Sequence, residues 1–180
     1  MKFLLFVLLI TTFIACDKDD DDNNPSIFYE IVSRNSDKCL DVAYASAGAR
    51  ASVIQWICHG GANQQWRLEP VSDGTVRITA HHSGQVLDVY GGLVDDVTPI
   101  IQFPWHGGDN QLWTVEPASN GYVFIVARHS GKVLDVERGS MDDGARVIQY
   151  TVHGGANQQW LLRAVAPAAA PITTLSDREP

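Results

Sequence analysis

The chain has 180 residues, of which 45% are hydrophobic and 19% are charged, and its formal net charge is −8. These values are typical of a globular domain that is long enough to bury a sizeable core. An acidic chain without a basic patch lacks the electrostatic footprint of nucleic-acid binding, so we expect no nucleic-acid partner and favour a neutral ligand.

The first segment, residues 1–15, is predicted to be an export signal. Lys2 supplies a positive end, and the apolar stretch after it is too short for a membrane-spanning helix. The stretch ends in Phe-Ile-Ala-Cys, whose last residue is Cys16. This ending resembles a bacterial lipobox, in which the signal is cleaved and a lipid is attached to the cysteine. An ordinary signal-peptide end with an incidental cysteine is the other interpretation.

An acidic linker, residues 16–26, follows the export signal. Its Lys-Asp-Asp-Asp run resembles the tag that directs some lipoproteins to the outer face of the outer membrane, and it also suits a solvated spacer. We therefore expect a protein that is lipid-anchored through Cys16 in a bacterial outer membrane, at the cell surface. The lipid is then its only contact with the membrane.

The region 27–167 consists of three copies of one unit, which we divide as 27–73, 74–120 and 121–167. Polar and apolar residues recur together at intervals of 47 positions. The recurring residues are Asp41, Asp88 and Asp135; Gln55, Gln102 and Gln149; His59, His106 and His153; Asn63, Asn110 and Asn157; and Trp66, Trp113 and Trp160. Because polar positions repeat in register with apolar ones, the pattern indicates that a chemical site was copied three times as well as a core.

Each copy is predicted to contain four short strands. In the third copy they span 122–127, 133–136, 146–151 and 159–163, with turn residues and a Gly- and Asp-rich loop between them. No window of helical period is long enough to compete. A propeller needs more than three such units, whereas a closed barrel of threefold pseudosymmetry, the β-trefoil, suits twelve strands and leaves few exposed edges. The Pro- and Ala-rich residues 168–180 are predicted to be a disordered tail.

The cysteines divide into one lipid attachment point and one pair. With Cys16 assigned to the lipid, Cys39 and Cys58 are left together in a protein bound for an oxidising compartment. The other two copies have apolar residues at the matching positions. We predict a disulfide in the first copy, with a stabilisation of roughly 3 kcal/mol in the chain-entropy model.

An aromatic residue stands 15 positions after each repeated Asp, as Trp56, Phe103 and Tyr150. A tightly packed core would resist these changes of volume, whereas a surface on which a sugar ring stacks would tolerate them. An ionised Asp can accept bonds from two adjacent hydroxyls, Asn both donates and accepts, and His does either. Together they predict a shallow sugar-binding pocket. The tryptophans of the Gln-x-Trp triplets are expected to be buried instead.

These residues resemble the ricin-type lectin family of β-trefoil carbohydrate-binding modules. The resemblance rests on three Gln-x-Trp triplets and three Leu-Asp-Val starts in register, and it covers about residues 27–165. In that family Asp and Asn bond the sugar hydroxyls, the aromatic residue stacks on the ring, and His lines the pocket. Carried over, the sugar-binding residues with their supporting glutamines are Asp41, Trp56, His59, Asn63 and Gln64; Asp88, Phe103, His106, Asn110 and Gln111; and Asp135, Tyr150, His153, Asn157 and Gln158.

The resemblance implies a monomeric lectin with up to three equivalent sugar sites, for glycan capture or adhesion. The expected partners are galactose-, xylose- or related polysaccharides, and no cofactor is needed. Three equal copies do not supply the two dissimilar groups of a catalytic site, so we expect no enzyme activity. The three repeated histidines fall one in each copy, and threefold symmetry should hold them well apart, so we expect no metal site.

Other interpretations of the same residues stay open. Each Asp could cap a turn and bond backbone amides, and each His could be structural. A non-catalytic β-trefoil also serves as a protein-interaction module or inhibitor. The second copy departs most from its sisters, at Pro104 and Asp109.

Overall fold

The fold was analysed in a computed structural model that describes residues 27–166. Its twelve strands are β1 (Tyr29–Ser33), β2 (Cys39–Val42), β3 (Val53–Trp56), β4 (Trp66–Pro70), β5 (Val76–Ala80), β6 (Val86–Val89), β7 (Thr98–Phe103), β8 (Trp113–Pro117), β9 (Val123–Ala127), β10 (Val133–Val136), β11 (Val147–Tyr150) and β12 (Trp160–Ala164). The expected all-β architecture of four strands per repeat is confirmed. The predictions for the export signal, Cys16, the acidic linker and the tail concern residues outside the described range.

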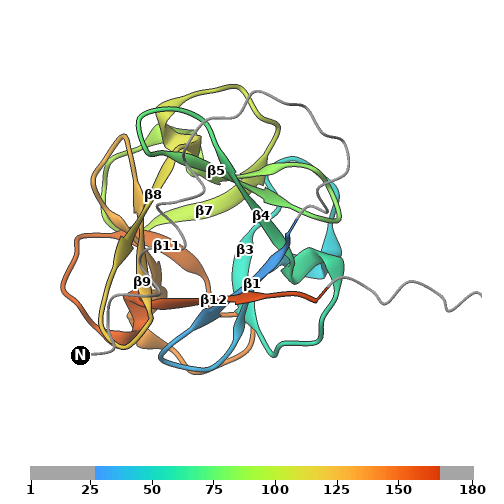
Figure 1. The fold of residues 1–180 in the computed structure, drawn as a ribbon, viewed down its shortest axis with the longest axis vertical. Helices are drawn as coiled ribbons and strands as arrows, with labels where there is room; N and C mark the ends of the chain where they lie inside the picture. Colours follow the sequence, from blue (N-terminus) through green and yellow to red (C-terminus); the bar gives the residue numbers. More distant parts are fainter. Residues whose placement is uncertain (1–26, 167–180) are drawn as a thin grey trace, which may run out of the picture.

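Six strands close into a barrel, two from each repeat (Figure 1). The antiparallel pairs run β1–β4, β4–β5, β5–β8, β8–β9, β9–β12 and β12–β1, which returns to the start. The longest registers join β4 to β5 and β12 to β1, as in Trp66 opposite Ala80 and Tyr29 opposite Ala164. Closure leaves these strands no unpaired edge, which explains how short strands form a stable sheet.

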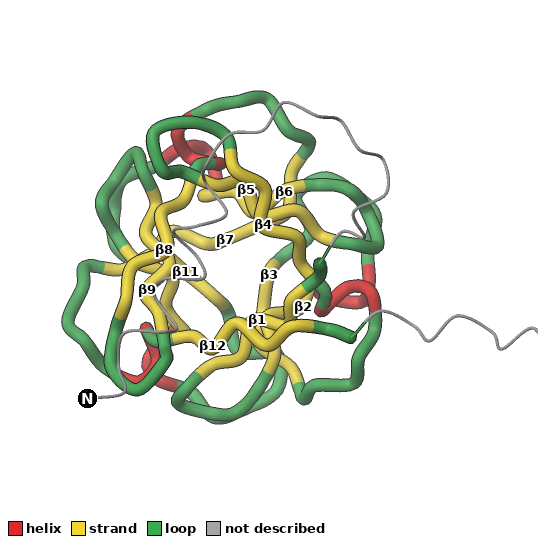
Figure 2. Tube along the Cα trace, in the orientation of Figure 1, coloured by secondary structure: helices red, strands yellow, loops and turns green. Residues whose placement is uncertain are grey.

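The remaining strands form one hairpin in each repeat, β2–β3, β6–β7 and β10–β11. Strand β7 also pairs with β11, and the isolated bridges Ser52–Ile101 and Ile54–Arg146 join the hairpins of adjacent repeats. In Figure 2 the strands gather at the centre, whereas the loops and short helical turns lie around the rim. The hairpins therefore meet near the pseudo-threefold axis and carry their loops outward.

The core contains the three tryptophans of the Gln-x-Trp triplets. Trp66, Trp113 and Trp160 are fully buried, as predicted. Each indole Nε1 donates to a leucine carbonyl two strands earlier in the same repeat, at 3.0 to 3.2 Å. The bond satisfies the one polar atom of a large apolar side chain, so burial of the ring carries no unpaired donor.

The structure modifies the predicted boundaries in the third repeat. The strand predicted at 146–151 is limited to Val147–Tyr150, and the last strand is Trp160–Ala164 instead of 159–163. The segment predicted as a loop at 153–157 leads into a single 3-10 turn, η7 (Ala156–Gln158). One turn of this kind is too short to leave a helical period in the sequence. No α-helix occurs within residues 27–166.

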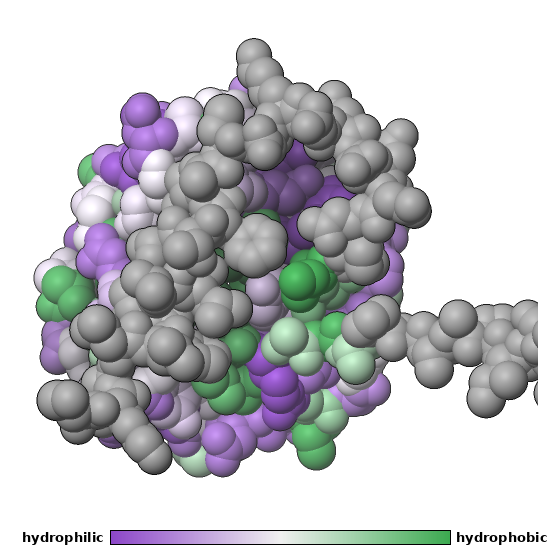
Figure 3. All heavy atoms as spheres, in the orientation of Figure 1, coloured by the Kyte–Doolittle hydropathy of each residue, from purple (hydrophilic) through white to green (hydrophobic). Residues whose placement is uncertain are grey.

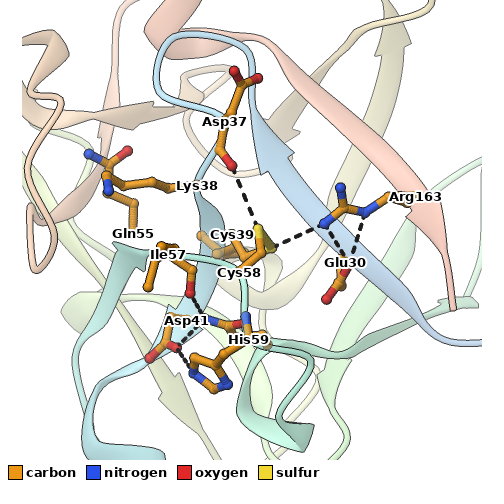
Figure 4. The surroundings of a disulfide bond; sticks show 12 residues. Glu30, Asp37, Lys38, Cys39, Asp41, Gln55, Ile57, Cys58, His59 and Arg163 are labelled. Atoms are coloured by element: carbon orange, nitrogen blue, oxygen red, sulfur yellow. Dashed lines mark hydrogen bonds and ion pairs between the residues drawn. A yellow bond between two sulfur atoms is a disulfide. The ribbon is translucent and has the colours of Figure 1, made fainter.

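The predicted disulfide joins Cys39 on β2 to Cys58 in the loop after β3. Figure 4 shows it between the Glu30–Arg163 ion pair and the Asp41–His59 pair. The other repeats bury a valine where Cys39 stands. At the position of Cys58, however, they carry Trp105 and Val152, which are 36% and 54% exposed. In the other two repeats a buried apolar residue therefore replaces only the Cys39 end of the bridge.

The face seen in Figure 3 mixes hydrophilic and hydrophobic residues wherever it is coloured. Residues 27–166 include no helix long and apolar enough to cross a lipid bilayer.

Candidate functional site

Each repeat brings its predicted residues together in one cluster, and the clusters are numbered site 1, site 2 and site 3 in chain order. In site 1, Asp41 lies on β2, and Asn63 and Gln64 lie on the 3-10 turn η3 (Ala62–Gln64). Gln64 Nε2 and Asn63 Nδ2 donate to the same oxygen, Asp41 Oδ2, at 2.8 and 2.9 Å. Sites 2 and 3 repeat the Gln-to-Asp bond at 2.8 and 2.9 Å. The pairs there are Gln111 with Asp88 and Gln158 with Asp135.

The glutamine and asparagine also bind the backbone around the pocket. Gln64 Oε1 accepts the backbone N–H of His59 at 2.8 Å, and its Nε2 donates to the Ile57 carbonyl at 3.0 Å. The asparagine of every site donates to the carbonyl of the last residue of its Asp-bearing strand, at 3.2 to 3.3 Å. These bonds fasten the loop that carries the histidine to the strand that carries the aspartate.

The histidine ring lies beside the aspartate in all three sites. His59, His106 and His153 each place Nε2 3.5 Å from the carboxylate Oδ2. Nδ1 accepts the N–H of the second following glycine at 3.1 to 3.2 Å. A neutral imidazole with an accepting Nδ1 carries its proton on Nε2, which is the nitrogen that faces the carboxylate. The histidine therefore both shapes the loop and lines the pocket.

The two oxygens of each carboxylate differ in their hydrogen bonding. The protein bonds to Asp41, Asp88 and Asp135 all reach Oδ2, and no donor in residues 27–166 bonds Oδ1. The partners are side chains, so the alternative in which each Asp caps a turn through backbone amides is not what the structure shows. Burial raises the pKa of these three carboxyl groups, and the hydrogen bond from the glutamine partly offsets it.

The aromatic residues stand at the edge of their pockets. Trp56, at the end of β3, is 41% exposed, and Phe103 and Tyr150 are half-buried. The rings of Phe103 and Tyr150 meet the histidine of their own site edge-on, with centroids 6.0 Å apart. A ring next to a carboxylate oxygen and an imidazole N–H offers an apolar face and polar edges, which is what a pyranose presents in return.

Cavities at sites 2 and 3 confirm that the predicted residues converge. The site 2 cavity is lined by Arg50, Asp88, Tyr90, Gly91, Gly92, Ile101, Phe103, His106 and Asn110. The site 3 cavity is lined by Val97, Asp135, Glu137, Arg138, Gly139, Ile148, Tyr150, His153 and Asn157. Each cavity holds the Asp, aromatic, His and Asn of one repeat together with one residue of the repeat before it. That last residue, Arg50 at site 2 and Val97 at site 3, lies outside the repeat that forms the site, so the pattern within one repeat does not predict it.

A second group that the sequence analysis left without a role is Gln55, Gln102 and Gln149. Their side chains are fully buried, and each Nε2 donates to two carbonyls in a loop of the preceding repeat in cyclic order. Gln102, for example, bonds the carbonyls of Ser46 and Gly48 at 2.7 and 2.9 Å. The 47-residue period did signal these glutamines, and the structure shows that they hold the loops that border the pockets.

Substitution of Gly155 by Ala is expected to disrupt the arrangement of site 3, and any ligand binding there, and to leave the other two sites intact. A Cβ on Gly155 would lie 2.6 Å from both His153 Cε1 and Asn157 Oδ1, so both side chains must move. NMR titration of the backbone amides with a bound sugar measures each site separately. Gly48 has room for a Cβ, 3.4 Å from Ser46 Oγ, and Gly48→Ala is the control. Normal binding at site 3 in the Gly155 variant would contradict this role.

No cluster of three or more His, Cys, Asp or Glu that could hold a metal ion occurs among residues 27–166. Each site has one Asp beside one His, and the cavities also contain Arg50 at site 2 and Glu137 with Arg138 at site 3.

Comparison with known proteins places this arrangement in a family. A match to the family described as "Ricin-type beta-trefoil lectin domain" covers residues 27–160. The structure is similar to the designed threefold-symmetric protein ThreeFoil, with 50% identity, a TM-score of 0.75, and coverage of 76% of this chain and 97% of that one. No curated protein matches the chain.

Two further solved structures show the same fold in other contexts. The exo-β-1,3-galactanase 1,3Gal43A from Clostridium thermocellum is 37% identical with a TM-score of 0.76, over 79% of this chain and 31% of that one. This chain therefore corresponds to about a third of that enzyme. The Rhizoctonia solani agglutinin is 21% identical with a TM-score of 0.70, over 78% and 96% of the two chains. The chain belongs to the family of ricin-type β-trefoil lectin domains, whose general function is carbohydrate binding.

Proposed function

We propose that this protein binds glycans through three pockets, one per repeat, without a cofactor and without catalysis. The observation that carries the proposal is the unoccupied bonding capacity of Oδ1 on each buried Asp, next to an aromatic ring at the pocket edge. The carboxylate accepts two sugar hydroxyls, the imidazole N–H donates to a third polar group, and the ring covers the apolar face of the sugar.

Each site alone is expected to bind weakly, with a dissociation constant of about 10⁻³ to 10⁻⁴ M, because a shallow pocket buries few ligand atoms. Three outward-facing sites on one chain raise the effective concentration of a polymeric ligand and can tighten binding by roughly 10²-fold or more. Galactose-containing polysaccharides are the first candidates, since a relative at 37% identity is an exo-β-1,3-galactanase. Xylose-based polymers form the second group.

Calorimetry and a glycan array with the full chain test this function. The matched variant replaces Trp56, Phe103 and Tyr150 by Ala, which removes the stacking surfaces and leaves the buried network in place. Sugar binding by the parent and its loss in the variant support the proposal. Binding to a glycan-free protein that persists in the variant would favour the protein-interaction module instead.

Sugar binding is expected to weaken as the pH falls. Protonation of Asp41, Asp88 or Asp135 converts a double acceptor into a hydroxyl donor, and burial raises the pKa of these groups above the ordinary Asp value of 3.8. Affinity should therefore decline at a higher pH than an exposed Asp would dictate. Titration calorimetry from pH 7 downward, with circular dichroism to confirm the fold at each pH, measures this. Constant affinity down to pH 3.8 would contradict it.

We also propose that the protein is displayed on the bacterial outer membrane through a lipid on Cys16. Support comes from the order of the N-terminal segments, an apolar export signal that ends at Cys16 and an acidic run directly after it. Protein processed in a bacterial host should partition into detergent, and the Cys16→Ala variant should stay in the aqueous phase. Equal partitioning of the two forms would exclude the lipid anchor.

A further inference from the structure

Each pocket takes one residue of its wall from the preceding repeat. Arg50 lines site 2 and Val97 lines site 3. The equivalent residue at site 1 is Gly144, where an added Cβ would lie 3.7 Å from Trp56 Cζ3. These three residues are 47 positions apart and share a left-handed backbone, with φ of 67°, 67° and 82°. The three repeats thus share this backbone conformation, but the side chain is an arginine at site 2 and a valine at site 3, and site 1 has a glycine.

At site 1 an aspartate holds this wall through an ion pair with a lysine and a hydrogen bond from the backbone, a group of three residues that we call the clip. Asp143, which precedes Gly144, accepts the backbone N–H of Ile57 at 2.9 Å and is paired with Lys38 at 2.7 Å. The same clip at site 3 consists of Asp96, Thr151 and Lys132. In both sites the added negative charge lies against a lysine, so the clip brings no net charge to the pocket.

Site 2 lacks all three parts of the clip. The residues at the equivalent positions are Ala49, Pro104 and Gln85. Proline has no N–H, so an acid at position 49 would find no backbone donor there. Gln85 instead donates to the Ala47 carbonyl at 2.6 Å. The three changes are mutually consistent, and they leave Arg50 at site 2 without an acidic neighbour of its own.

Arg50 is exposed and lies over the stacking ring of site 2. Its Cζ is 5.9 Å from the centroid of Phe103, and its backbone N–H donates to Gln102 at 2.8 Å, which fixes the start of the side chain. Within residues 27–166 it forms no ion pair. The only acidic residue of the site 2 cavity is Asp88, whereas the site 3 cavity contains Arg138 together with Glu137, which is paired with Arg146 at 2.7 Å.

We propose that site 2 is specific for a sugar that carries a carboxylate, such as a hexuronate, and that Arg50 is its specificity-determining residue. This inference rests on the sugar-binding function proposed above. Asp88 accepts the ring hydroxyls on one side, and the planar guanidinium of Arg50 bonds the carboxylate on the other. Site 1, which has Gly144 in place of the arginine, takes a neutral sugar. The three sites are therefore related in fold but differ in ligand.

The test is an NMR titration of the full chain in which one glycine amide reports each site. Gly61, Gly108 and Gly155 donate their N–H to the pocket histidines of sites 1, 2 and 3. The probes are galacturonate, its methyl ester and galactose, which share the same ring hydroxyls and differ in charge. We expect Gly108 to saturate at an about fivefold lower concentration of galacturonate than of the ester, as for an exposed ion pair. High salt should reduce this preference.

The matched variant is Arg50→Val, because valine already occupies the same left-handed position at Val97. The variant should remove the preference of site 2 for galacturonate, as measured at Gly108, and should keep the response of Gly108 to galactose. Arg138→Gly, which copies Gly91 of site 2, is the control and should leave the response of Gly108 unchanged. Equal affinity of site 2 for acid and ester, or a preference that survives Arg50→Val, would overturn the inference. No response of any reporter to any probe would overturn the sugar-binding function as well.

Discussion

Replacing Asp135 by Asn is expected to weaken sugar binding at site 3 by about ten- to a hundredfold without destabilising the fold. The amide oxygen can still accept from Gln158, which bonds Asp135 Oδ2 at 2.9 Å, but the pocket then receives an NH₂ in place of Oδ1. Hydrogen bonds to a charged group contribute about 1.5 to 3 kcal/mol, which corresponds to this loss of affinity. Amide shifts of Gly155 during a sugar titration measure the affinity at site 3.

The Asn variant is predicted to be at least as stable as the wild type at neutral pH. Burial raises the folded-state pKa of Asp135 above the ordinary Asp value of 3.8, so its contribution to stability is fully present below that value and is lost as pH rises through the folded pKa. At neutral pH the wild type therefore holds a desolvated charge that the amide lacks. The free energy of unfolding of the Asn variant should equal or exceed that of the wild type at pH 7, and this advantage should shrink in acid.

The Ala variant at the same position separates binding from folding. Asp135→Ala leaves a buried N–H of Gln158 without its acceptor, which costs about 1 to 3 kcal/mol. We expect the Asn variant to lose binding and keep its stability. The Ala variant should lose binding and also be less stable. Full affinity of site 3 in the Asn variant would show that the carboxylate is not the sugar ligand.

Removal of the disulfide is expected to lower the free energy of unfolding by about 3 kcal/mol, since the bridge closes a loop of 19 residues. The matched variant is Cys39→Val with Cys58→Val, which copies Val133 and Val152 of the third repeat. Val152 is 54% exposed, so a valine at position 58 should recover little by packing. Denaturant unfolding of both proteins measures the difference.

The same variant should affect the three sites unequally. Cys58 immediately precedes His59, so the bridge anchors the loop of site 1, whereas sites 2 and 3 have no bridge (Figure 4). We expect weaker binding at the Gly61 reporter and unchanged binding at the Gly108 and Gly155 reporters. Wild-type protein treated with a reductant is the control and should match the double variant. Unchanged stability in both would contradict a structural role for the bridge.

The sequence alone was sufficient to predict the fold and the Asp, His, Asn and aromatic residues that lie together in each repeat. The 47-residue period indicates three repeats, and the alternation within it indicates four strands per repeat. Three such units are too few for a propeller and suit a closed barrel of threefold pseudosymmetry. The Asp, His, Asn and aromatic residues of one repeat come together because one hairpin and its following turn hold them all. Such contacts are local, so a repeated pattern is enough to predict them.

Contacts between repeats were beyond the sequence and were decided by the tertiary structure. Arg50 lies over the ring of Phe103, which is 53 positions later in the chain. Gln55 donates to the carbonyls of Ser140 and Asp142, in the last repeat. No periodic pattern within a repeat specifies which loop of its neighbour borders a pocket. That choice follows from the closed barrel, which brings each hairpin against the loop of the preceding repeat. The sequence therefore determined three similar pockets, and the packing of neighbouring repeats made them different.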